Sequence, residues 1–386
     1  MKKISAEFIF PGNSTPIKNG VVVFDVNGTI ETILNPELDK IDWNEVEKYE
    51  GIICPGFVNT HCHLELSYLK GQLTKETELH GFIKEIISVR DKFTEEERLK
   101  AIDLADNEMI NNGIVAVGDI SNGNSTFNQK AESKINYHTF LEVFSLNPAL
   151  AKEVIEKTTR LKEAYPNQQH VSITTHAPYS MSQELMNAVN EASGNILTIH
   201  NQETASENEL FLTKTGKLYE ELSSFSEDIK NWTATGKNSL PSFLPNFDSS
   251  KNILLVHNTF TNKEDISFAK AYSDSIYWCF CPNANEYIEK RQPNYSLFIN
   301  EKCTIGTDSL ASNWSLSILD ELKTISIKDS TISLETLIKW STFNGAQFLG
   351  FEKLGLIEKG KQPGLNLISG LDGMKLGKYS SVKRII

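Results

Sequence analysis

The sequence contains few cysteines and no long apolar run. These two absences argue against a disulfide-stabilised protein and against a membrane-spanning one. Five scattered cysteines in 386 residues are too few and too irregular for a disulfide framework. No uncharged apolar stretch approaches the roughly 18 residues of a membrane span, and the mean hydropathy is −0.30, so no such span is expected. Glu7 interrupts the apolar residues near the start, so no signal peptide is predicted. These observations favour a cytoplasmic protein.

Positive charge is also scarce. Lysine and arginine total 38 against 50 aspartates and glutamates, and the resulting net charge of −12 argues against a nucleic-acid partner. The hydrophobic share of 39%, together with 22 glycines, is nevertheless that of an ordinary globular protein. A chain of this length can form one large α/β barrel with a small appendage.

Eight short β-rich runs alternate with helical stretches through the middle of the chain. Strand–helix alternation repeated eight times predicts a closed (β/α)₈ barrel of the TIM type. The last forty residues and the first 55 instead show short apolar runs separated by turn residues. The eight runs end near His63, Ile120, Phe144, Pro178, Glu203, Phe260, Asn285 and Ser309.

Two intervals between these runs are longer than one strand–helix unit requires. The run ends lie 57 residues apart after the first run and again after the fifth, whereas a unit needs roughly 25–35 residues. Loops that follow strands lie on the active face of a barrel. Residues 64–93 and 204–250 are therefore predicted to form lids or walls of a substrate pocket.

Histidines recur at the ends of the predicted strands, although the chain has only eight. They are His61, His63, His176, His200 and His257. Side chains at the carboxyl ends of barrel strands converge on the active site. Residues i and i+2 of a strand point to the same side, so His61 and His63 can together hold one divalent metal. The alternative is that the two histidines occur by chance on a polar loop.

Three acidic residues join this set. Glu203 follows His200 at the border of strand and loop, where a carboxylate suits a general acid/base; an exposed loop glutamate is the alternative. Asp308 directly follows an apolar strand, and a buried carboxylate there is costly unless it is paired or ligates a metal. Glu65 is expected either to bind substrate or to cap its loop.

Two further histidines have candidate roles. His257 could orient or polarise the attacked group, and His176 could contact substrate or act as a distal ligand. For each alone, a hydrogen-bonded core histidine is the commoner explanation. Taken together, the strand-end residues favour an active site.

Five motifs occur in an order that resembles the amidohydrolase superfamily. They are GFVNTHCH at 56–63, THAPYS at 175–180, HNQE at 200–203, VHN at 256–258 and GTD at 306–308. The resemblance is strongest to the cytosine deaminase and S-adenosylhomocysteine deaminase-like branch, which includes chlorohydrolases. Residues 63–67 and 306–313 are similar to aminodeoxyfutalosine deaminase-like members.

The resemblance implies a site built around one divalent metal. Binuclear members carry a carboxylated lysine at the end of the fourth strand, and residues 173–176 contain none. Zn²⁺ suits such nitrogen and carboxylate ligands, with Fe²⁺ as the alternative. The implied ligands are His61, His63, His200 and Asp308, with Glu203 as proton shuttle and His257 as a second catalytic histidine.

The same resemblance implies a domain organisation. Residues 1–55 and 346–386 together would form a small β-sandwich beside a barrel of residues 56–345. A homodimer is the habit of the family.

The expected reaction is deamination of a small-molecule substrate. An amino-substituted purine, pyrimidine or related heterocycle, nucleoside-type compounds included, would release ammonia after attack by metal-bound hydroxide, with Glu203, His257 and Asp308 as catalytic residues. Hydrolysis of a cyclic amide or a carbon–halide bond at the same site is the alternative. The non-enzymatic alternative is a catalytically silent barrel scaffold. The presence of every expected type of metal ligand argues against this alternative.

Overall fold

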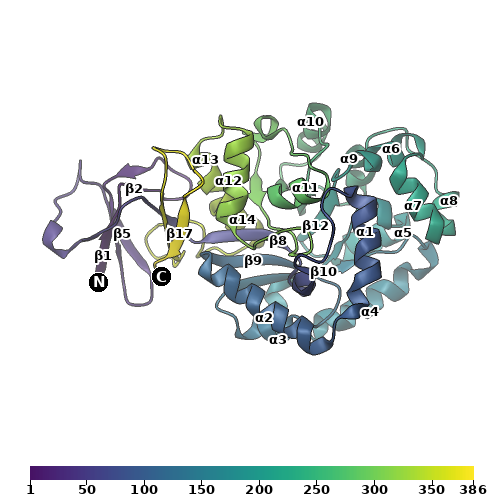
Figure 1. Cartoon of the computed structure of the whole chain (residues 1–386), viewed down its shortest axis with the longest axis horizontal. Coiled ribbons are helices and arrows are strands. Elements are labelled where there is room, and N and C mark those ends of the chain that lie inside the picture. Colours follow the sequence, from purple (N-terminus) through teal and green to yellow (C-terminus); the bar gives the residue numbers. More distant parts are fainter.

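The computed structural model describes residues 1–386 as two four-stranded parallel sheets surrounded by helices, with two smaller sheets at one end of the molecule (Figure 1). One parallel sheet has the order β11-β10-β9-β8 and the other the order β12-β13-β14-β15. All eight predicted strands are confirmed. Their bounds are β8 Phe57–Cys62, β9 Ile114–Ser121, β10 Asn136–Val143, β11 Val171–Thr175, β12 Ile196–Asn201, β13 Asn252–His257, β14 Ile276–Phe280 and β15 Cys303–Ile305.

Hydrogen bonds join the two parallel sheets at both pairs of edges. The backbone N–H of His200 donates to the carbonyl of His176 at 2.9 Å, which links the ends of β11 and β12. At the other side, the N–H groups of Thr307 and Asp308 both donate to the carbonyl of His61 at 3.0 Å. The carboxyl ends of all eight strands therefore face the same side of the molecule.

Helices follow most strands and cover the sheets. Helix α2 begins with a capping box, in which Thr94 Oγ1 accepts the N–H of Glu97 and the Glu97 carboxylate accepts the N–H of Thr94. The helices outside the two long insertions are α2 Glu95–Asn111, α3 Phe127–Glu132, α4 Ala151–Glu163, α5 Gln183–Ala192, α10 Lys263–Tyr272, α11 Pro282–Ile288, α12 Ile318–Lys328, α13 Leu334–Ser341 and α14 Phe343–Leu349.

The two long insertions pack against each other. Residues 64–93 contain helix α1 (Glu78–Val89), and residues 204–250 contain α6 (Ala205–Thr213), α7 (Lys217–Phe225), α8 (Glu227–Asn231) and α9 (Ser239–Phe243). Leu79 and Phe82 of the first insertion share one buried apolar cluster with Leu218 and Leu222 of the second. Tyr179 and Ala311, which follow strands β11 and β15, belong to the same cluster. Both insertions therefore lie on the face where the strands end.

The ends of the chain form the two smaller sheets. Their orders are β5-β4-β1-β6 and β17-β16-β7-β2-β3, and both are tied together by a buried apolar cluster that includes Ile4, Val22, Ile53 and Leu365. Strand β7 pairs antiparallel with β16, and Gly56 alone separates β7 from β8. The bounds are β1 Lys2–Ser5, β2 Phe8–Ile9, β3 Ile17–Lys18, β4 Val21–Phe24, β5 Ile30–Leu34, β6 Glu47–Lys48, β7 Ile52–Pro55, β16 Leu365–Ser369 and β17 Ser381–Arg384.

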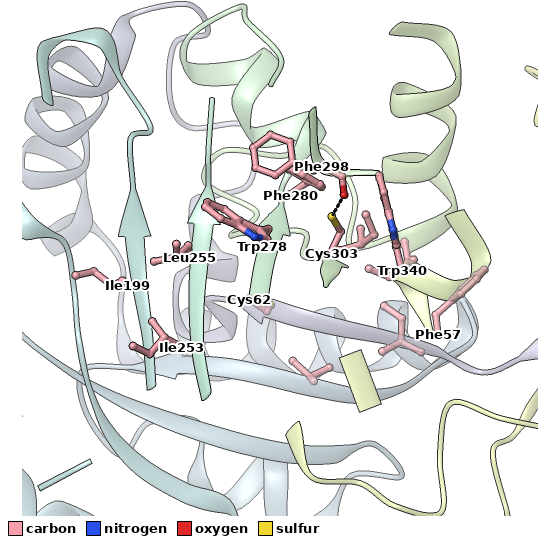
Figure 2. Close-up of a cluster of buried hydrophobic side chains, with 14 of the residues drawn as sticks. Phe57, Cys62, Ile199, Ile253, Leu255, Trp278, Phe280, Phe298, Cys303 and Trp340 are labelled. Atoms are coloured by element: carbon pink, nitrogen blue, oxygen red, sulfur yellow. Dashed lines mark hydrogen bonds between the residues drawn. The ribbon is translucent and has the colours of Figure 1, made fainter. Parts of the chain in front are cut away.

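The main core lies between the parallel strands and the helices. Figure 2 shows Trp278 and Phe280 of β14 beside Phe298, with ring centroids 5.1 Å apart in each pair. The Cys303 thiol donates to the carbonyl of Phe298 at 3.2 Å, and all five cysteines are buried and free. Such edge-to-face aromatic packing stabilises the strands that carry the polar residues at their ends.

The boundary expected at residue 345 falls inside helix α14. Ala346, Phe348 and Leu349 of this helix are buried in a cluster with Val58 of β8 and Phe140 of β10. The helix therefore packs with the parallel sheets along its whole length. None of the helices combines the length and the apolar character needed to cross a bilayer.

Candidate metal centre

Three histidines at the carboxyl ends of strands β8 and β12 meet in one place, with His63 directly after β8. The Nε2 atoms of His61 and His63 lie 3.2 Å apart, and a ring nitrogen of His200 completes a group whose atoms all lie within 4.8 Å of one another. Burial lowers the pKa of all three imidazoles, that of His63 to about 4. Neutral imidazoles present lone pairs, so the donor set fits a divalent cation.

The orientation of His200 is set by its second ring nitrogen. Nδ1 lies 2.7 Å from the carbonyl oxygen of His176, and because a carbonyl only accepts, Nδ1 is the donor. This leaves Nε2 as the free nitrogen, the usual arrangement for a histidine that ligates a metal. The His176 ring stands beside that of His200, with centroids 4.9 Å apart.

Asp308 supplies a carboxylate to the same group. Its Oδ1 lies 3.6 Å from Nε2 of His61 and 3.4 Å from Nε2 of His63, while Ser312 Oγ donates to Oδ2 at 2.5 Å. Burial opposes ionisation of Asp308, but the neighbouring imidazoles of His61, His63 and His257 outweigh it, so the pKa of Asp308 lies below its usual range. Three imidazoles and one carboxylate form a set that Zn²⁺ favours.

Glu203 and His257 form a second pair beside the histidines. Glu203 Oε1 lies 3.6 Å from His257 Nε2, and the other ring nitrogen of His257 lies 2.9 Å from Asn285 Oδ1. Since an amide oxygen accepts, Nδ1 is the donor and Nε2 faces Glu203 without a proton. Burial raises the pKa of Glu203 well above its usual range, which favours a protonated carboxyl.

Backbone conformation helps to place these side chains. His257 has a φ of 75° and Asp308 a φ of 57°, in the left-handed region that residues other than glycine rarely adopt. Glu207 accepts the N–H groups of Gln202 at 3.0 Å and Glu203 at 3.3 Å. The turn that carries Glu203 is therefore held by a buried carboxylate.

Glu65 occupies a capping position. Both of its carboxylate oxygens lie 3.1 Å from the N–H of Asn122, which follows strand β9. Burial raises the pKa of Glu65 to about 7. Glu65 thus binds a backbone N–H of the loop after β9 rather than of its own loop, and a contact of Glu65 with substrate stays a prediction.

The sequence did not point to a buried ion pair behind the histidines. Asp119 Oδ2 and Lys130 Nζ lie 2.5 Å apart, and both side chains are 0% exposed. Asp119 Oδ1 also accepts the N–H of Leu64, the residue after His63, at 2.8 Å. Asp119 lies near the carboxyl end of the apolar strand β9, and that signal could have identified it. The pair fixes the chain just beyond the predicted metal ligands.

Replacing Lys130 with methionine is expected to lower the free energy of unfolding by about 3–5 kcal/mol, because it leaves the Asp119 carboxylate buried and unpaired. Urea denaturation measures the change. Lys152→Met is the matched control, since this lysine is 88% exposed and should contribute less than about 1 kcal/mol. Equal stability of the two variants would contradict the structural role of the pair.

Comparisons with known proteins show what the whole chain is similar to. The chain is 26% identical over 373 residues to aminodeoxyfutalosine deaminase of a Nitratiruptor species, covering 93% of this chain and 89% of that protein. A crystal structure of Helicobacter pylori aminofutalosine deaminase with methylthio-coformycin superposes with a TM-score of 0.80 at 22% identity, covering all of both chains. A zinc-bound adenosine deaminase from Xanthomonas campestris superposes with a TM-score of 0.72 at 19% identity, covering 95% of this chain and 84% of that one.

A family model matches most of the sequence. The model of the amidohydrolase family matches residues 52–384, a range that begins at β7 and ends at β17. This range contains every candidate ligand and both candidate catalytic partners described above. The chain belongs to the amidohydrolase family.

Proposed function

We propose that this protein is a metal-dependent hydrolase that removes the amino group of a nucleoside-type heterocycle and releases ammonia. The observation that carries the proposal is the burial, in one place, of three neutral imidazoles, the Asp308 carboxylate and the Glu203–His257 pair. Two of the relatives described above are named as deaminases of aminodeoxyfutalosine and of adenosine, which supports a nucleoside-type substrate.

His61, His63, His200 and Asp308 would hold one divalent cation, with Zn²⁺ preferred and Fe²⁺ as the alternative. When bound, the cation supplies the positive charge that makes a water molecule acidic enough to serve as a nucleophile near neutral pH. Residues 173–176, at the end of β11, offer no lysine for a second cation.

The other buried groups would move protons and hold the reacting atoms. A protonated Glu203 can donate its proton to a ring nitrogen of the substrate, which makes the adjacent carbon more electrophilic. The carboxylate left behind can then take the remaining hydroxyl proton of the attacking water and pass it to the departing amine. His257 Nε2, free of a proton, can accept a hydrogen bond from the attacking water. The Asp308 carboxylate can receive the proton of that water.

We also propose that the two parallel sheets form one closed (β/α)₈ barrel and that the terminal sheets form a small β-sandwich. The hydrogen bonds at both sheet edges and the apolar cluster of the terminal strands support this division. The first boundary would be the expected one, at residue 55, and the second would lie beyond α14, at residue 349 rather than 345. A homodimer and a cytoplasmic location stay predictions.

The decisive experiment is an ammonia assay over amino-substituted nucleosides and free bases, run beside cyclic amides and chloro-triazines. Ammonia from amino-heterocycles is expected, with about one metal per chain by elemental analysis. Treatment with a chelator should abolish the release, and Zn²⁺ or Fe²⁺ should restore it. Activity confined to cyclic amides or chloro-triazines would favour the alternative reactions, and a metal-free, inactive protein would favour the scaffold.

A further inference from the structure

Glu321, on helix α12, is completely buried, and its two carboxyl oxygens accept hydrogen bonds from two different segments of the candidate site. Oε1 accepts from Asn313 Nδ2 at 2.7 Å, and Oε2 accepts from the backbone N–H of Asn283 at 2.8 Å. Asn313 lies in the loop after β15, and Asn283 lies in the first turn of α11, just after β14. One buried side chain therefore joins the segments that follow two neighbouring strands.

The contact with Asn313 leads to Asp308. Asn313 Nδ2 also donates to the carbonyl of Thr307 at 2.9 Å, and Thr307 directly precedes Asp308 in the chain. Ser312, the residue before Asn313, donates its hydroxyl proton to the Asp308 carboxylate. When Glu321 holds Asn313, Asp308 is therefore supported both through its backbone and at its side chain.

The contact with Asn283 leads to His257. Helix α12 holds Asn283 at two points, because Asn283 donates its N–H to Glu321 and its Oδ1 accepts from Thr324 Oγ1 at 2.6 Å. Asn285, two residues further along α11, accepts from Nδ1 of His257 at 2.9 Å. Helix α12 therefore supports the residue that keeps Nε2 of His257 free of a proton.

The residues at the ends of these two routes have backbone conformations that need support. Asp308 and His257 both have a positive φ, in the left-handed region. Residues other than glycine keep such a conformation only where the surrounding structure holds them. Loss of the hydrogen bonds to Glu321 should therefore let Asp308 and His257 move apart from their present arrangement.

This arrangement requires an acceptor at each of the two carboxyl oxygens. A glutamine at position 321 would place an NH₂ group against the N–H of Asn283 or against Nδ2 of Asn313. Asn313 cannot exchange its amide oxygen and nitrogen without loss, because its Oδ1 accepts the N–H groups of Trp314 at 2.8 Å and Ser315 at 3.3 Å. A buried donor without an acceptor is destabilising, so Glu321→Gln should break one of the two contacts while keeping the size of the side chain.

We propose that Glu321 is a positioning residue that fixes Asp308 and His257 relative to each other. Glu321 acts through Asn313 on the carboxylate that would ligate the metal, and through Asn283 on the histidine that would hold the attacking water. The inference rests on the proposed function for these two roles. Glu321 itself would touch neither the metal nor the substrate.

The main test is Glu321→Gln, with Glu335→Gln, at an exposed position on α13, as the matched control. The affinity for Zn²⁺, measured by chelator competition, should fall about 10–100-fold, the range typical of residues that support a metal ligand. In the ammonia assay kcat should also fall, while KM stays close to that of the wild type. A role confined to stability would lower only the free energy of unfolding, which urea denaturation of the same sample measures.

Two further variants separate the two routes. Asn313→Ala removes the contact toward Asp308 and should lower the affinity for Zn²⁺. Thr324→Val removes the second support of Asn283 and should lower kcat while the affinity for Zn²⁺ stays that of the wild type. Should Glu321→Gln fail to fold, the metal affinity of Asn313→Ala decides alone.

The metal affinity distinguishes failure of this inference from failure of the proposed function. If no amino-heterocycle releases ammonia but Glu321→Gln and Asn313→Ala bind Zn²⁺ more weakly, the proposed reaction fails and the positioning role stands. Wild-type affinity for Zn²⁺ in Asn313→Ala would overturn the proposal, even if the wild-type protein is an active deaminase.

Discussion

Replacing Glu203 with glutamine should lower kcat by about 10²–10⁴-fold, the range typical of a lost general acid/base, while the metal content stays that of the wild type. The amide has nearly the shape of the carboxyl but cannot exchange the proton that the substrate nitrogen and the departing amine require. Because Glu203 lies 3.6 Å from His257 and is not part of the histidine group, coordination should survive. Steady-state kinetics and elemental analysis of the same sample measure both quantities.

Glu191→Gln is the matched control, because this glutamate lies at an exposed position on α5. It should leave kcat and metal content at wild-type values. Should Glu203→Gln lose its metal, Glu203 would have to be counted as a ligand and the separation between coordination and proton transfer would be wrong.

Replacing His61 with alanine should remove both the metal and the activity. Its Nε2 lies 3.2 Å from that of His63 and 3.6 Å from the Asp308 carboxylate, so its loss opens the centre of the proposed ligand set. The metal affinity should fall by more than the roughly 10–100-fold that loss of a residue supporting a ligand costs. A chelator competition measures the affinity, and the ammonia assay measures the activity.

His80→Ala tests whether any histidine change has this effect. His80 lies on α1, where its ring is 3.6 Å from Glu78, and it takes no part in the group that faces the proposed metal. It should retain metal and turnover. A His61→Ala variant that kept one tightly bound metal per chain would mean that the cation is held elsewhere.

The strands and their polar ends could be predicted because the signals are local. Each β-run is a short apolar segment in the sequence, and a histidine or acid directly after it must lie at the carboxyl edge of a parallel sheet. This reasoning brought His61, His63, His200 and Asp308 to one place, and the distances between their side chains agree with it. Their roles as ligands stay predictions.

Other site residues could not be predicted because their partners are distant in sequence. Nothing in the sequence around Lys130 distinguishes it from other lysines on short helices. Its partner Asp119 lies on β9, and only the fold places Asp119 Oδ2 2.5 Å from Lys130 Nζ. The pairing of β7 with β16 likewise joins segments about 310 residues apart.

That last pairing has a consequence for how the protein is made. Strands β1, β4, β5 and β6 all lie within the first 48 residues, so their sheet can form soon after they leave the ribosome. Strand β7 must wait for β16, and at 5–20 residues per second the delay is roughly 15–60 s. During this time the edge of β7 lacks its final partner, and β8 with His61 continues directly from it. The strand that leads directly into the first histidines thus gains its last partner only after nearly the entire polypeptide has been synthesised.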